Sequence, residues 1–282
     1  MASYSEYLKI AESERLIARL EVYLDLDRAF EPGVLGLETR DARQWGPPLR
    51  CFAPRKAMDA FIAEVVKDLP PFVAYGSGDF HHLTAAFLRK IRTPFTLVSF
   101  DNHPDWDVRP PYWACGGWMK RALELPNLRR AVVWGCGNFE LNWPARMFRS
   151  RRVEVFAWKE RYPKRGRITH DNWQSEFERF AESLGDVYIT VDMDCLRDAV
   201  TNWENGLFSA GDAAWAIATL RSRANVIGGD ICGAYSKPVY ERRPQAFAAE
   251  WDHPKIPPPD PERARAINTA ALQAIWPTLA SG

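Results

Sequence analysis

Short runs of apolar residues alternate along the chain with longer, helix-like segments. The short runs are rich in valine, isoleucine, phenylalanine and tyrosine, a composition that is typical of strands. They predict strands at residues 20–26, 72–75, 95–100, 131–135, 153–157, 187–191 and 225–229. The longer segments predict helices at residues 56–68, 83–91, 117–124, 174–184, 210–222 and 260–275, with Pro261 in the first turn of the last one.

This alternation predicts an α/β fold. The strands are almost continuously apolar, as strands are when both faces of a sheet are covered. Right-handed crossovers would place helices on both faces, so we expect three layers (αβα) with a mostly parallel central sheet. The proline clusters punctuate loops but separate no second unit, so we expect a single domain over residues 1–282. Ligands of such sheets bind outside the carboxyl ends of the strands.

Polar clusters follow three of the predicted strands. "GSGDFHHLT" follows residues 72–75, "DNHPDWD" follows residues 95–100, and "TVDMDCLRD" closes residues 187–191. Their acidic and imidazole side chains are Asp79, His81 and His82; Asp101, His103, Asp105 and Asp107; and Asp192, Asp194 and Asp198. The pattern "LDLD" at residues 24–27, in contrast, is expected to mark a strand end or a helix start with no role in a site.

The conjunction of these clusters points to metal ions. Carboxylates gathered at one edge of a sheet repel one another and are costly to bury, and a divalent cation is the simplest counter-charge. Residues two apart in an extended segment point to the same side. Asp101, His103 and Asp105 can therefore converge, and so can Asp192 and Asp194. With one histidine of the first cluster, this makes two imidazoles and four carboxylates, too many ligands for one catalytic zinc.

Oxygen-rich ligation with some imidazole suits manganese, with zinc, iron, cobalt and nickel as competitors. Carboxylates that bridge two ions fit the number of ligands better than a single ion does. We therefore expect two divalent metal ions, Mn²⁺ first among the candidates.

The same clusters resemble the signature motifs of the ureohydrolase superfamily, which contains arginases, agmatinases and formiminoglutamases. "GSGDFHH" resembles its Gly-Gly-Asp-His motif, "DNHPD" its Asp-Ala-His-x-Asp motif and "TVDMD" its Ser-x-Asp-x-Asp motif. "VIGGDIC" resembles the late Gly-x-Asp-Ile segment, so the resemblance covers roughly residues 70–235. It implies an arginase-like fold and a binuclear manganese site. The implied ligands are Asp101 and Asp192 as bridges, completed by His81, Asp105, His103 and Asp194.

One assignment within these motifs stays open. Phe80 is an extra residue between the aspartate and the histidines of the first motif, so either His81 or His82 can be the ligand. Matching "HHLT" to the histidine-small-leucine pattern of the superfamily favours His81.

The resemblance implies hydrolysis of a C–N bond in a small amide, amidine or guanidine-type substrate by metal-activated hydroxide. The candidate catalytic residues are Cys115, near the position of the arginase proton-shuttle histidine, Asp107 and the late aspartate Asp230. Gly233 stands where guanidine-cleaving members have a glutamate, so the chain is not expected to be a true arginase. A Gly233→Glu change is then a candidate route to guanidine binding. Tryptophans near the motifs are candidate walls of a pocket for a less polar group: Trp106, Trp113, Trp118 and Trp203.

Two other readings compete with this one. A single-zinc, deacetylase-like hydrolase would use Asp101, His103 and an aspartate of the third motif, but it would not need both Asp105 and Asp194. A metal-binding domain without catalytic activity would explain the missing glutamate.

Composition limits the partners. The formal net charge of +1 gives no electrostatic case for binding nucleic acid or acidic membranes. No apolar run approaches the roughly 20 residues that span a bilayer. Five scattered cysteines predict free thiols in a reducing cytoplasm. We expect a small-molecule substrate and allow for a homo-oligomer.

Overall fold

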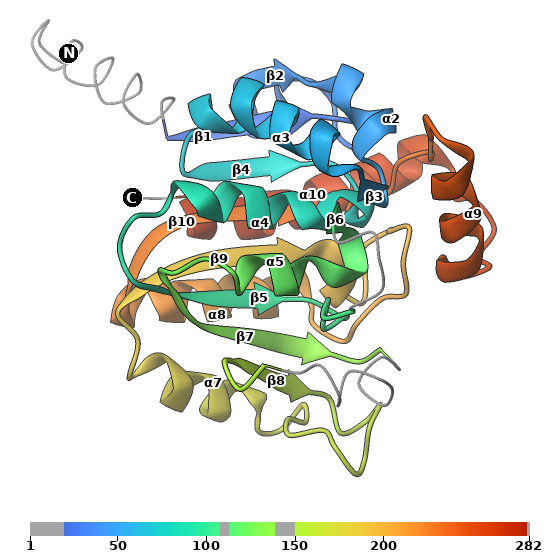
Figure 1. The fold of residues 1–282 in the computed structure, drawn as a ribbon. Helices are drawn as coiled ribbons and strands as arrows, with labels where there is room; N and C mark the ends of the chain where they lie inside the picture. The colour runs from blue at the N-terminus through green and yellow to red at the C-terminus, as the bar shows by residue number, and fades with distance from the viewer. Residues whose placement is uncertain (1–19, 108–112, 139–149, 281–282) are drawn as a thin grey trace, which may run out of the picture.

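The centre of the molecule is an eight-stranded sheet in which every neighbouring pair of strands is parallel (Figure 1). The computed structural model describes residues 20–107, 113–138 and 150–280. In order across the sheet, the strands are β2 (Thr39–Asp41), β1 (Glu21–Asp25), β4 (Phe72–Tyr75), β10 (Asn225–Cys232), β9 (Asp186–Asp192), β5 (Phe95–Phe100), β7 (Leu128–Cys136) and β8 (Val153–Ala157). A separate antiparallel pair consists of β3 (Phe52–Ala53) and β6 (Trp113–Ala114).

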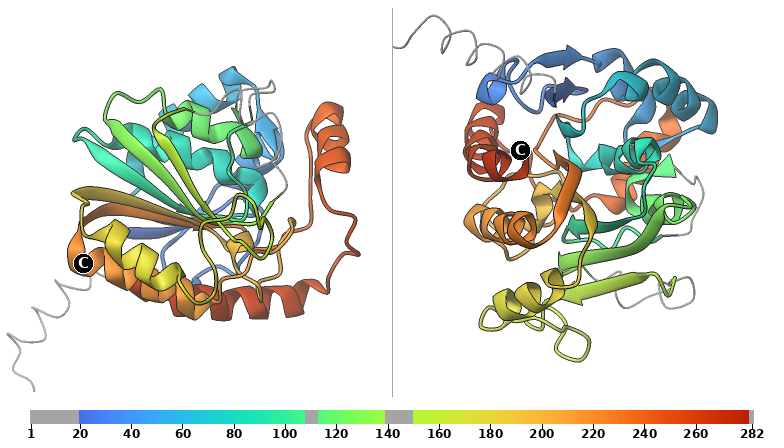
Figure 2. Two further views of the ribbon diagram at one scale, coloured as in Figure 1. Left: turned by 90° about the horizontal axis from the view of Figure 1, so that it is seen from below. Right: turned by 90° about the vertical axis from the view of Figure 1, so that its left-hand side faces the viewer.

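Helices cover both faces of this sheet (Figure 2). One layer contains α7 (Trp173–Ala181), α8 (Ala210–Arg223) and α10 (Pro261–Ala280). The other contains α3 (Arg55–Glu64), α4 (Thr84–Phe87) and α5 (Trp118–Ala122). Within the described ranges, the remaining helices are α2 (Gly46–Leu49) and α9 (Arg243–Asp252). Turns of 3₁₀ helix occur there at Val34–Gly36, Arg43–Trp45, Val66–Asp68, Gly78–Leu83, Leu88–Lys90, Cys115–Gly117 and Met193–Cys195. The predicted three-layer αβα fold is confirmed.

Strand β5 shows why the strands appear in the sequence as continuous apolar runs. Val98 and Phe100 pack into the core beneath α7 and α8, whereas Phe95 and Leu97 pack into the core beneath α5. Successive side chains of a strand point to opposite faces, so a strand covered on both sides must be apolar at nearly every position.

All seven predicted strands are present, with ends that differ by a few residues at most. The predicted helix at residues 83–91 is instead a series of short helical turns around α4. Every residue from 80 to 88 is buried, so packing on all sides shapes this segment rather than one amphipathic face. Helix α9 was not predicted, because Phe247 and Trp251 are 67% and 75% exposed and leave no buried stripe to detect.

The strand order brings the three polar clusters together. Strands β4, β9 and β5 precede the clusters, and only β10 lies among them in the sheet. Because all these strands are parallel, the three loops leave from the same edge. Helix α9 lies on the side toward which the strands point (Figure 1). No helix in the described ranges is both long and apolar enough to span a membrane.

Candidate metal centre

The six predicted metal ligands meet at the carboxyl edge of the sheet, and all six are buried. Asp101 and His103 follow β5 directly, and Asp105 lies two residues farther along the same loop. Asp192 ends β9, Asp194 lies in the turn after it, and His81 lies in the 3₁₀ turn after β4. Two groups of possible ligands form within this set.

The first group surrounds His81. Its Nδ1 atom lies 3.0 Å from Oδ2 of Asp105, 3.3 Å from Oδ2 of Asp101 and 3.4 Å from Oδ2 of Asp192. Nδ1 is fully buried and has no hydrogen-bond partner in the described part of the chain. Three carboxylate oxygens therefore surround one nitrogen at distances that are typical of ligand atoms bound to the same metal ion.

The second group surrounds His103. Its Nδ1 atom lies 2.7 Å from Oδ2 of Asp194 and 3.8 Å from Oδ1 of Asp101. Asp101 thus turns one oxygen toward each histidine. The two groups share this carboxylate and form one continuous cluster.

The backbone of both loops orients these carboxylates. Oδ1 of Asp101 accepts a hydrogen bond from the His103 amide at 2.7 Å, and Oδ1 of Asp192 accepts one from the Asp194 amide at 3.0 Å. Asp194 in turn accepts from the Asn102 amide at 3.1 Å, which ties the two loops together. Asp105 has a φ of 47°, a left-handed conformation that is uncommon for aspartate and characteristic of functional sites.

Side chains behind the cluster hold the ligands in place. Trp118 donates its indole N–H to Oδ2 of Asp105 at 2.5 Å. Nε2 of His81 lies 3.1 Å from the hydroxyl of Thr190, which donates to Oδ1 of Asp230 at 2.7 Å. Such outer contacts fix the tautomer and orientation of a metal-binding histidine.

The electrostatics of the cluster call for a cation. Among the described residues, no lysine or arginine forms an ion pair with Asp101, Asp105, Asp192 or Asp194, and only the two histidines do. Burial and the neighbouring charge of Asp194 raise the pKa of Asp192 well above its ordinary value. Burial alone would lower the pKa of His81, but the carboxylates of Asp101 and Asp105 raise it well above its ordinary value.

Divalent ions therefore fit this set of donors. The oxygen and imidazole atoms are those that manganese and related ions prefer. The orphaned Nδ1 of His81 would gain a partner, and the carboxylates would gain the positive charge that they lack.

Comparisons with solved structures agree with the architecture. Proclavaminate amidino hydrolase from Streptomyces clavuligerus matches with a TM-score of 0.56 and 14% identity, over 94% of this chain and 93% of that one. Arginase from Bacillus subtilis matches with a TM-score of 0.55 and 12% identity, over 93% and 98%. Agmatine ureohydrolase of Thermoplasma volcanium matches with a TM-score of 0.50 and 16% identity, over 91% and 92%.

The chain has the arginase fold. The predicted resemblance to the ureohydrolases is confirmed at the level of fold. No family model matches the sequence. An uncharacterized protein of Thermotoga maritima is 30% identical over 177 residues, which are 61% of this chain and 62% of that protein. The chain thus matches less than two thirds of the length of this relative.

Within the arginase fold, the glycine at position 233 has a local cause. Gly233 follows β10 with a φ of 101°, a conformation that favours glycine. A Cβ atom here would lie 2.2 Å from Oδ1 of Asp192 and 2.5 Å from the amide nitrogen of Met193. A Gly233→Glu change would therefore displace a predicted metal ligand, which overturns our expectation that it could supply guanidine binding.

The three candidate catalytic residues occupy different surroundings. Asp230 is fully buried and accepts hydrogen bonds from the hydroxyls of Thr190, Thr84 and Tyr188, at 2.7, 3.0 and 2.8 Å. This is the geometry of a residue that orients Thr190 and, through it, His81.

Cys115 and Asp107 belong to neither group of candidate ligands. Cys115 is partly buried, and its amide donates to the carbonyl oxygen of Cys51 at 2.8 Å. Burial, followed by the charge of Cys51, raises the pKa of the Cys115 thiol well above its ordinary value, so few thiolates form near neutral pH. Asp107 is partly buried, and its amide donates to the carbonyl oxygen of Gly116 at 2.9 Å. Their catalytic roles stay predictions.

A network beside the cluster was not predicted. Arg50 is buried and donates to Asp79 at 2.7 Å, and it also contacts Asp27 at 3.4 Å. Asp27 accepts from the Ser77 amide at 3.1 Å, so the second aspartate of "LDLD" supports the His81 loop, contrary to expectation.

His253 was missed as well. Its Nε2 atom lies 2.8 Å from Oδ1 of Asp79, and its ring packs edge-on against Trp203. The chain has five histidines, and this scarcity was the one sequence signal that could have drawn attention to His253.

The tryptophans divide into different roles. Trp118 is fully buried, and its ring is tilted over His81, so it supports the cluster rather than a pocket. Trp203 is half-buried and packs edge-on against His103 with ring centroids 5.6 Å apart. Trp106 and Trp113 are also half-buried.

The histidine pair yields a test with a built-in control. His82 is fully buried, and neither ring nitrogen has a hydrogen-bond partner among the described residues. Burial, followed by the charge of His81, lowers the pKa of His82 to about 3. We expect His81→Leu to lose affinity for one ion, because its Nδ1 faces three carboxylates, whereas His82→Leu keeps both ions. Elemental analysis after dialysis against manganese measures the bound metal, and circular dichroism verifies folding. The reverse pattern would show that His82, and not His81, is the ligand.

A second test concerns the charge of the metal-free cluster. Burial, followed by the charge of Asp101, raises the pKa of Asp105 to about 6. The folded chain therefore binds a proton that the unfolded chain releases near pH 4, and the resulting stability is lost as pH rises through about 6. Without metal, Asp105→Asn should be more stable than wild type at about pH 8, by on the order of 1–3 kcal/mol, and similar at about pH 4.5.

Chemical unfolding of the metal-free proteins at both pH values measures this difference. Added manganese should stabilise wild type more than the variant, since the variant lacks a ligand. A metal-free variant that is less stable than wild type at the higher pH would show that the Asp105 charge is already balanced.

Proposed function

We propose that this protein is a binuclear metal hydrolase of the ureohydrolase superfamily that cleaves a C–N bond in a small amide, amidine or guanidine-type substrate. The observation that carries the proposal is the pair of ligand groups around His81 and His103, which share Asp101. The arginase fold supports it, because the cluster lies where open α/β sheets bind their ligands.

The residues that would hold the two ions divide as the geometry suggests. His81 and Asp105 belong to one ion, and His103 and Asp194 belong to the other. Asp101 contacts both histidines, and Asp192 contacts His81 and orients Asp194, so these two are the proposed bridges. Two divalent ions at such a centre lower the pKa of water and stabilise negative charge that develops on the substrate. Manganese is our first candidate, with zinc, iron, cobalt and nickel as competitors.

The protein itself contributes order and shielding. Trp118 fixes Asp105, and Thr190 with Asp230 fixes His81, so the ligands need little rearrangement when ions bind. Trp203 lies against His103 and keeps water from that side of the ring. A water-excluding wall strengthens electrostatic interactions within the site.

The geometry favours two ions over one. A single-zinc hydrolase would need Asp101, His103 and one further aspartate. Here Asp105 contacts His81 at 3.0 Å, and Asp194 contacts His103 at 2.7 Å, so each lies in a different group. Both carboxylates would be superfluous and costly to bury around a single ion.

We place the protein in the cytoplasm and expect it to act on small molecules. All five cysteines are free, which suits a reducing compartment. The structural neighbours named above include an arginase, an agmatine ureohydrolase and an amidino hydrolase, whose substrates carry the class of bond that we propose.

Metal stoichiometry tests the proposal directly. Metal-free protein reconstituted with manganese should bind two ions per chain, about 4 Å apart as in other two-metal catalytic sites. Asp101→Ala and Asp192→Ala should each lose more metal than Asp194→Ala, because bridges contact both ions. Elemental analysis gives the stoichiometry, and magnetic coupling between the two manganese ions in electron paramagnetic resonance reports their proximity.

Asp198→Ala provides a matched control, since Asp198 follows the same motif and its side chain is 77% exposed. It should bind manganese as wild type does. Saturation at one ion without magnetic coupling would favour the single-zinc reading instead.

The substrate range follows from Gly233. Guanidine-cleaving relatives are expected to use a carboxylate at this position, and here Asp192 fills the space that a side chain would need. Positioning of a substrate can supply roughly 7–11 kcal/mol of barrier reduction, so its loss matters. We expect the manganese-loaded protein to hydrolyse arginine and agmatine poorly or not at all. Release of urea at about 1–10³ s⁻¹, the ordinary enzyme range, would contradict this.

A panel of small amides, amidines and guanidines, assayed for released ammonia, urea and amines, then searches for the true substrate. The Asp101→Ala variant is the control for activity that does not depend on the metal centre. Absence of metal-dependent turnover across all three classes would favour the non-catalytic reading.

A further inference from the structure

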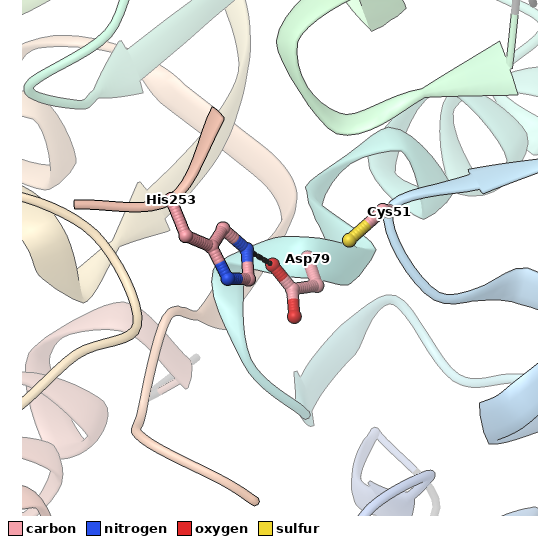
Figure 3. Close-up of side chains that lie close together, drawn as sticks. All are labelled: Cys51, Asp79 and His253. Atoms are coloured by element: carbon pink, nitrogen blue, oxygen red, sulfur yellow. Dashed lines mark hydrogen bonds and ion pairs between the residues drawn. The ribbon is translucent and has the colours of Figure 1, made fainter. Parts of the chain in front are cut away.

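Three side chains from distant parts of the chain lie close together (Figure 3). Cys51 precedes β3, Asp79 lies in the turn after β4, and His253 follows α9. A sulfur, a carboxylate oxygen and a ring nitrogen of these residues all lie within 4.8 Å of one another. Cys51 and Asp79 are buried, and His253 is mostly buried. None of the three belongs to the proposed binuclear centre.

The residues around this cluster set one guanidinium and one imidazole against two buried carboxylates. Arg50 is the only lysine or arginine of the described ranges that pairs with Asp79 or Asp27, and it serves both. One guanidinium thus faces two buried carboxylates. Oδ1 of Asp27 is also buried and has no hydrogen-bond partner among the described residues. The guanidinium alone leaves one negative charge, which either the charged form of the His253 imidazole or a bound cation would compensate.

A dication bound to a thiolate supplies that missing charge. The cation adds two positive charges and the ionised thiol adds one negative charge, so together they contribute one positive charge. A cation that binds the Cys51 sulfur would displace the thiol proton, because metal binds the deprotonated form of cysteine.

We propose that Cys51, Asp79 and His253 form a third metal site, separate from the binuclear centre and selective for zinc-class ions. Sulfur, nitrogen and oxygen donors in one set are typical of zinc, whereas manganese prefers oxygen. Three protein ligands leave one position of a tetrahedron for water or another small ligand.

The surroundings provide the outer contacts that such sites use. Arg50 donates to Oδ2 of Asp79 at 2.7 Å and leaves Oδ1 facing His253. Trp203 donates to Oδ1 of Asp79 at 3.2 Å and packs against the His253 ring at 4.5 Å. Ligating carboxylates are commonly held by hydrogen bonds of this kind. The ion would fasten the segment that follows α9 to the loop that carries His81.

Cobalt titration of the metal-free protein tests the site, because cobalt replaces zinc and reports its ligands by colour. Binding to a thiolate produces a near-ultraviolet charge-transfer band that oxygen and nitrogen ligands do not. We expect three equivalents of cobalt per chain and a thiolate band. Cys51→Ser should abolish the band and remove one equivalent, and His253→Gln should weaken binding at this site at least tenfold.

Cys232→Ser and Cys115→Ser are the matched controls. Cys232 lies near Asp192 and His81, and Cys115 is hydrogen-bonded to Cys51, so either could otherwise be the source of a band. Both variants should keep the band. A band that survives Cys51→Ser, an unchanged titration of His253→Gln, or no band at saturation would overturn the proposal. Circular dichroism verifies folding, and His253→Gln decides the matter if Cys51→Ser does not fold.

The cobalt titration tests the third site and the binuclear centre independently. One equivalent with a band that depends on Cys51 would support the third site and refute the binuclear proposal. Two equivalents without a band would do the reverse.

Discussion

Buried negative charge without matching lysine or arginine is the constraint on which this site depends. Asp101, Asp105, Asp192 and Asp194 are buried together, and their ion-pair partners among the described residues are histidines alone. Carboxylates in such surroundings are unfavourable unless they are protonated or bound to a cation. These carboxylates lie at the carboxyl edge of the sheet, where backbone amides and the indole of Trp118 hold them in fixed orientations. The cluster is therefore preorganised to bind a cation.

Strand order turns three local motifs into one site. Strands β4, β10, β9 and β5 are neighbours in the sheet, although β10 is the last of them in sequence. A parallel sheet releases all its loops from one edge, so residues more than a hundred positions apart meet there. The buried strands supply the rigidity, because their side chains pack on both faces. Precise placement of ligands therefore rests on the hydrophobic cores and not on the loops alone.

The parts that could be predicted from sequence are those with a local signal. Strands appear as apolar runs, and the ligand motifs follow them directly. Arg50 and His253 have no such signal, because each acts on Asp79 from a separate segment and only the folded chain brings them together. Trp118 is visible in the sequence as a tryptophan near a motif, but its hydrogen bond to Asp105 forms only when the fold places α5 beside the loop after β5. Asp27 has no local signal either, because its pattern is ordinary and its partner Ser77 lies in another loop.

Under the proposed function, Gly233 would separate metal binding from substrate recognition. Asp192 occupies the space beside Gly233, so the loop after β10 can approach the cluster only as bare backbone. Any group that recognises a substrate must then come from elsewhere around the cluster. Trp203 packs against both His103 and His253, and His253 reaches this place from the segment after α9. Under that proposal, segments that carry no motif, such as the one after α9, would recognise the substrate, and the motif-bearing loops would hold the predicted metal ligands.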